Sequence, residues 1–157
     1  MKKPKNYIGN IIPSEDTIFV FGSNPQGIHG AGSARVAMIY FGAKRGQGEG
    51  LQGQSYGLPT TNLNFNDNRL PPIKRGMPKE EIISHIKKLY KCALENTDKN
   101  FKVAYRNHFN EETICGYNGG EMIEMFKAAA VDFNGIPENI WFSQEWVDSG
   151  LFDEDNG

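Results

Sequence analysis

Short apolar runs along the chain predict four strands. Residues 17–21 form an apolar run between a polar segment and Gly22, which indicates a buried strand. Residues 101–105 alternate between apolar and polar side chains, and residues 139–142 form another short apolar run. Residues 55–60 predict a further strand, which a proline stops near its end.

Apolar positions at helical spacing predict a first helix over residues 31–41. Val36, Ile39 and Tyr40 share one face of this helix. Gly42 stands where a glycine commonly ends a helix.

A second helix follows Pro78, which fits the first helical turn, while Glu80 and Glu81 favour the positive end of the helix dipole. His85 lies on the polar side of this helix, where we expect it to be solvated. The apolar stripe consists of Ile82, Ile83, Ile86, Leu89, Tyr90 and Ala93.

A third helix is expected to begin near Asn118. Met122, Met125 and Phe126 follow at helical spacing and are expected in the core. Tyr117 lies just before this helix, where it could stack on a base or pack in the core.

Strands and helices alternate, which favours an α/β fold with helices on both faces of a sheet. The length suits one domain, residues 1–157, with an acidic tail over residues 148–157 that we expect to fray. In such folds ligands bind beyond the carboxyl ends of the strands. Residues 22–32 and 113–120 each connect a strand to a helix, so both segments should lie at that ligand end.

Charge and composition narrow the possible partners. The formal net charge is −2, from 17 basic and 19 acidic residues, so nucleic-acid binding is not expected, although a local basic patch stays open. No apolar run approaches the roughly 20 residues that span a bilayer. No apolar signal core follows the basic N-terminus. We therefore expect no membrane partner and a cytoplasmic location.

Cys92 and Cys115 are far apart and lack metal-ligand spacing, so we expect two reduced thiols and no metal site. His108 forms no metal pattern with His29 or with either cysteine. No cofactor is evident, and Mg²⁺ held through a ligand's phosphates would leave no motif.

Ten of the 18 glycines lie within residues 22–57. The first group occupies residues 22–34, where a strand enters a loop of small residues and then a helix. Unpaired N–H groups at a helix start favour anions, and glycines let a phosphate approach the backbone. The segment is therefore a candidate phosphate or pyrophosphate cradle, or alternatively a tight turn with close helix packing.

Neither glycine-rich stretch is a standard nucleotide loop. Gly22 and Gly27 have the spacing of P-loop glycines, but Ile28 and His29 replace the lysine and hydroxyl residue, which argues against an ATPase. Residues 48–53 match the dinucleotide fingerprint, yet a predicted strand follows where a helix is required. We interpret them as a second flexible loop.

Three side chains in these loops could act on a ligand. Asn24 could orient a ribose or an amide. His29 could act as a general acid or base, or merely hydrogen-bond the loop. Glu49 could activate a water or bind a ribose hydroxyl, or be a solvated loop charge.

The glycine-rich stretches belong to longer motifs at residues 21–24, 27–34, 41–43, 46–56 and 59–60, with weaker ones at 116–117 and 137–140 and at Glu121 and Phe126. These motifs resemble a family of small macrodomain-like proteins found in bacteria and their phages. The resemblance implies a three-layer α/β/α sandwich with a mixed sheet. It also implies a cleft for ADP-ribose or a related NAD-derived nucleotide, in the host cytoplasm if a phage encodes the protein.

The resemblance also assigns places in that cleft. Asn24 matches an asparagine that contacts the distal ribose, and residues 29–33 match the helix entry that lines the diphosphate. Residues 113–118 correspond to a second loop that closes over the phosphates. Here residues 106–113 contain no glycine, so this loop is longer and more polar than the family pattern.

The sequence therefore predicts a protein that binds an ADP-ribose-type nucleotide or an ADP-ribosylated substrate. If it hydrolyses an ADP-ribosyl bond, Asn24, His29 and Glu49 are the catalytic candidates. Alternatives are a module that sequesters a nucleotide and a protein-interaction scaffold. The candidate ligand-binding residues are Gly22, Ser23, Asn24, Gly27, His29, Gly30, Ala31, Gly32, Ser33, Gly48, Gly50, Gln52, Gly53, Thr113, Cys115, Gly116, Tyr117 and Asn118.

Overall fold

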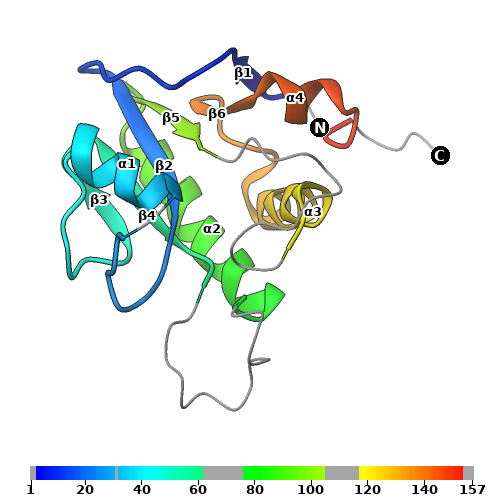
Figure 1. Ribbon diagram of the computed structural model, residues 1–157. Coiled ribbons are helices and arrows are strands. Elements are labelled where there is room, and N and C mark those ends of the chain that lie inside the picture. Colours follow the sequence, from blue (N-terminus) through cyan, green and yellow to red (C-terminus); the bar gives the residue numbers. More distant parts are fainter. Residues whose placement is uncertain (1–2, 31, 62–75, 105–116, 154–157) are drawn as a thin grey trace.

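The computed structural model describes residues 3–30, 32–61, 76–104 and 117–153 (Figure 1). Its strands form one sheet in the order β1-β6-β5-β2-β4-β3. Strands β3 and β4 pair antiparallel, and all other neighbours in the sheet pair parallel. The strands are β1 (Lys5–Tyr7), β2 (Thr17–Ser23), β3 (Gly50–Gln52), β4 (Ser55–Pro59), β5 (Asn100–Val103) and β6 (Ile140–Ser143). The helices are α1 (Gly32–Tyr40), α2 (Lys79–Glu95), α3 (Gly119–Ala130) and α4 (Gln144–Asp148), with a 3-10 turn at Val131–Phe133.

The central strand β2 sends alternate side chains into two separate apolar clusters. Ile18 and Val20 join the larger cluster, to which α2, α3 and α4 contribute. Phe19 and Phe21 join a smaller cluster with the buried alanines of α1. Helices therefore cover both faces of a mixed α/β sheet, as predicted (Figure 1).

All four predicted strands are present, within two residues of their expected bounds. Strand β3 was missed because it lies inside the glycine-rich stretch interpreted as a loop. The edge strand β1 was missed because two of its three residues are exposed polar side chains, which leave no apolar run.

The apolar spacing predicts α1 correctly but not the face that the helix buries. Val36, Ile39 and Tyr40 point outward, with Ile39 56% and Tyr40 64% exposed. The buried positions are Ala34 and Ala37, whose small side chains let the helix lie close to β2. Phe41, just after the helix, fills the remaining space by stacking on Phe19 with ring centroids 4.4 Å apart.

The two longer helices agree with the sequence analysis. Pro78 precedes the first turn of α2, and the expected stripe is buried except for the half-buried Ile83. Helix α3 starts after Asn118 with a reciprocal cap. The Glu121 N–H donates to the Asn118 side chain at 2.8 Å, and the Asn118 N–H donates to the Glu121 carboxylate at 3.2 Å. Met122 and Met125 lie in the core, as predicted.

The prediction that residues 148–157 fray is wrong for the part that the structure describes, which ends at residue 153. Phe152 is completely buried, and its ring lies 4.6 Å from that of Phe142 in β6. The acidic residues around Phe152 led to the prediction of fraying, whereas this one aromatic side chain holds the segment against the sheet.

We expect Phe152→Ala to lower the free energy of unfolding by about 3–4 kcal/mol, because it empties a fully buried aromatic site. Chemical denaturation monitored by tryptophan fluorescence measures this change. The matched control is Leu151→Ala, whose side chain is exposed and should change stability by less than about 0.5 kcal/mol. Equal effects of the two substitutions would contradict the anchoring role of Phe152.

Candidate functional site

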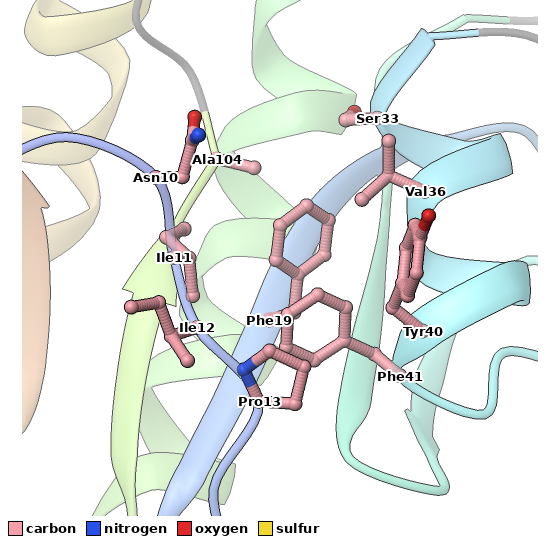
Figure 2. A pocket seen from close by; sticks show the side chains of 10 residues that line it. All are labelled: Asn10, Ile11, Ile12, Pro13, Phe19, Ser33, Val36, Tyr40, Phe41 and Ala104. Atoms are coloured by element: carbon pink, nitrogen blue, oxygen red, sulfur yellow. The ribbon is translucent and has the colours of Figure 1, made fainter.

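A cavity of about 520 Å³ lies between α1 and residues 10–13, over the α1 face of the sheet (Figure 2). Figure 2 shows Ile11 and Ile12 on one side, Val36 and Tyr40 on the other, and the rings of Phe19 and Phe41 between them. Among the described residues, the cavity is lined by Asn10, Ile11, Ile12, Pro13, Phe19, Ser33, Val36, Tyr40, Phe41 and Ala104.

The cavity reaches the end of the sheet where a ligand was expected. Ser33 belongs to the first turn of α1, and Ala104 directly follows β5. Of the predicted ligand-binding residues that the structure describes, Ser33 alone lines this cavity. Two of the exposed apolar residues of α1, Val36 and Tyr40, form one wall of the cavity.

Asn24 shapes the loop that joins β2 to α1. Its side-chain oxygen accepts a hydrogen bond from the Ile28 N–H at 3.0 Å, and its amide nitrogen donates to the Ile28 carbonyl at 2.8 Å. The Gly27 N–H also donates to the Asn24 carbonyl at 3.1 Å. The buried amide keeps one N–H and one oxygen lone pair beyond these bonds, which a ligand could use.

His29 fastens the same loop to residues 44–47. Its Nε2 lies 2.9 Å from the Lys44 carbonyl and 3.0 Å from the Gln47 carbonyl, so Nε2 must carry the donated proton. The imidazole is 2% exposed, and its edge contacts Phe21. Its Nδ1 is buried without a hydrogen-bond partner among the described residues. This geometry corresponds to the loop-bonding alternative for His29.

The two glycine-rich stretches meet backbone to backbone. A Cβ on Gly48 would lie 2.0 Å from the Asn24 carbonyl oxygen, and a Cβ on Gly27 would lie 2.3 Å from the Gly46 carbonyl carbon. The Gly46 N–H donates to the Gly27 carbonyl at 2.8 Å. Glycine is required at both positions because no side chain fits between the segments. The structure therefore brings the two motifs together by direct packing.

Gln52 and Gly53 give residues 44–50 their shape. The buried Gln52 side chain accepts from the Lys44 N–H at 2.8 Å and donates to the Gln47 carbonyl at 3.1 Å. Gly53 has a φ of +62° and packs on Gly42, where a Cβ would lie 2.8 Å from the Gly42 oxygen. Gly50, at the start of β3, has a φ of +90°. These residues support the loop and do not line the cavity.

Glu49 points away from His29, toward α2. Its carboxylate contacts the His85 Nδ1 and lies 3.5 Å from the Lys88 Nζ. The prediction that His85 is solvated is wrong, because this contact leaves its side chain only 21% exposed. Since α2 covers the face of the sheet opposite α1, the structure separates Glu49 from the other two catalytic candidates, Asn24 and His29.

The remaining predicted site residues lie from the end of β2 to the start of α1, just before α3, or outside the described residues. Ser23 is buried, whereas Gly30 is exposed with open space around its Cα. Gly22 lies near the end of β2, and Gly32 begins α1 with a φ of +60°. Tyr117 donates its hydroxyl to the Met77 carbonyl at 2.6 Å, and Asn118 caps α3. Those outside the described residues are Ala31, Thr113, Cys115 and Gly116.

Sequence reasoning missed one wall of the cavity, residues 10–13. These residues carry no catalytic chemistry, and their apolar pair precedes a proline in a segment without regular structure. The available signal was a pair of isoleucines ahead of a predicted buried strand. In the structure Ile12 is exposed and Ile11 is partly buried.

The described ranges contain no group of three His, Cys, Asp or Glu side chains that could hold a metal ion. None of the helices in these ranges combines the length and the apolar character that crossing a bilayer demands. Comparison of the chain with protein-family models, curated proteins and solved structures found no match.

We expect Gly48→Ala to lower the free energy of unfolding by about 1–3 kcal/mol, because the new methyl group collides with the Asn24 backbone. Thermal unfolding measures the change. Gly30→Ala is the matched control, since nothing lies within 4 Å of the added Cβ and its stability should change by less than about 0.5 kcal/mol. A Gly48→Ala protein as stable as wild type would refute the close packing.

Proposed function

We propose that this protein binds an ADP-ribose-type nucleotide in the cavity between α1 and residues 10–13. The observation that carries the proposal is the position of the cavity, which starts at the first turn of α1 and extends along an apolar floor. Its volume of about 520 Å³ is in the range of small-molecule sites.

The lining of the cavity suits a base better than a phosphate. None of the ten lining residues is charged, and the rings of Phe19, Tyr40 and Phe41 offer flat apolar surface. Asn10 adds a polar side chain to this lining. A planar, uncharged group with polar edges fits this chemistry, and an adenine ring is such a group.

The start of α1 supplies the complementary chemistry for a diphosphate. Backbone N–H groups of a first helical turn have no partners within the helix and favour an anion. The first turn of α1 contains no acidic side chain that would compete for these groups. Gly30 and Gly32 keep the approach to them free of bulky side chains. Base and diphosphate sites adjoin at Ser33.

The fold is consistent with the family resemblance. A mixed sheet with helices on both faces is what a three-layer macrodomain-like sandwich requires. The motifs that contain Asn24 and Gly27 pack against the motif at residues 46–56, through the close approaches of Gly48 to Asn24 and of Gly27 to Gly46. On this resemblance we assign the protein to the cytoplasm, of the host cell if a phage encodes it.

The arrangement supports binding rather than hydrolysis. Neither Asn24, nor His29, nor Glu49 lines the cavity. Asn24 and His29 use their polar atoms to fix the loop, and the Glu49 carboxylate lies against α2. We therefore propose that the nucleotide is bound and released intact.

We expect Val36→Trp to weaken ADP-ribose binding by about tenfold or more, because an indole would occupy cavity space. Isothermal titration calorimetry measures the affinity. Met38→Trp is the matched control, since Met38 lies on α1 with similar exposure but outside the cavity lining. Both variants should fold like wild type.

The same titration tests the ligand class. ADP-ribose should bind and be recovered intact by chromatography after denaturation, whereas ATP should bind more weakly. Absence of ADP-ribose binding to wild type would refute the proposal and favour the protein-interaction scaffold. Release of free ADP-ribose from an ADP-ribosylated peptide would instead make the protein a hydrolase.

A further inference from the structure

We infer that Glu49 and His85 are positioning residues that hold the β2–α1 loop in its ligand-binding shape. They do so by tying residues 44–50 to α2. This inference rests on the proposed function for its ligand, whereas the tie itself belongs to the free protein.

Glu49 and His85 are partly shielded from solvent, and both carboxylate oxygens of Glu49 have a partner on α2. The His85 Nδ1 contacts one Glu49 carboxylate oxygen, and the Lys88 Nζ lies 3.5 Å from the other. The Glu49 side chain is 33% exposed. His85 and Lys88 stand three residues apart on α2 and therefore share one side of that helix. An ion pair held from both oxygens fixes the position of its loop more firmly than a single exposed contact.

A short path connects this pair to the loop. Glu49 is bonded to Gly48, and the Gly48 backbone is pressed between the Asn24 carbonyl and Gly57 of β4. One residue earlier, the Gln47 carbonyl accepts the hydrogen bond from His29. A shift at Glu49 would therefore reach both Asn24 and His29 within two residues.

Residues 44–50 have other supports, so losing the pair would loosen them without unfolding the protein. Gln52 holds them from inside through Lys44 and Gln47. Strand β3 continues them, but it is only three residues long and forms the edge of the sheet. Segments of this kind lie at the low end of local stability. The Glu49–His85 contact is their tie to a long buried helix.

The test compares the ADP-ribose affinity of wild type and variants by isothermal titration calorimetry at one fixed pH. His85→Ala should weaken binding about three- to tenfold, as expected for coupling through an intervening segment. His85→Gln keeps a donor for Glu49, so it should restore part of the affinity.

The matched control is Lys87→Gln, which removes a different ion pair of α2, between Lys87 and Asp132 at 2.7 Å. It should leave the affinity at the wild-type value. Unchanged affinity in His85→Ala would overturn the inference. So would an equal loss in Lys87→Gln, which would indicate a general effect on α2.

Amide hydrogen exchange of the free protein separates this inference from the proposed function. His85→Ala should speed exchange at residues 24–29 and 44–49, relative to wild type and Lys87→Gln, while leaving α3 unchanged. Wild type that fails to bind ADP-ribose would refute the proposed function, and the exchange result would still decide the tie. Equal exchange in His85→Ala and wild type would overturn it.

Discussion

Direct contact between two backbones, at Gly48 and Asn24, is the constraint on which the ligand end of this molecule depends. The 2.0 Å that would separate a Gly48 Cβ from the Asn24 oxygen leaves room for hydrogen only. This approach puts the Lys44 and Gln47 carbonyls within reach of His29. It also leaves Glu49 facing α2. Loop shape, imidazole orientation and carboxylate orientation therefore follow from one close contact.

The other side of the site depends on the small residues of α1. Ala34 and Ala37 let the helix rest on β2, while its larger apolar side chains are left over for the cavity and the surface. Phe41 and Phe19 close the floor beneath them. The cavity is thus a product of helix packing, and the two glycine-rich segments pack against each other outside its described lining. Binding and support are divided between different residues.

Much of the fold could be predicted because local patterns decided it. The apolar runs of β2 and β6, the stripe of α2 and the cap at Asn118 each carry their structure within a few neighbouring residues. Phe152 could not be predicted as an anchor, since its burial depends on Phe142 rather than on its acidic neighbours. The prediction of the buried face of α1 was wrong for a related reason. Small alanines occupy the buried positions, which hydrophobicity alone would have assigned to Ile39 and Tyr40.

The candidate site, too, could be predicted only where its residues are close together in the sequence. The sequence indicated that Asn24, His29 and the glycines belong together, because each lies in a continuous motif. It could not indicate that His85 meets Glu49, since 36 residues separate them and no local pattern connects them. Residues 10–13 went unnoticed because apolar lining has no chemical signature. Contacts between distant segments decided what the motifs do.

The two walls of the cavity differ in kind. One wall is a helix fixed to the sheet by buried alanines, and the other is the irregular connection between β1 and β2, where Ile12 is largely exposed. Such a connection can shift at lower cost than a packed helix. A wider ligand would therefore be accommodated by movement of residues 10–13. Discrimination between similar ligands would come from α1, and redesign of ligand selectivity would begin with that helix.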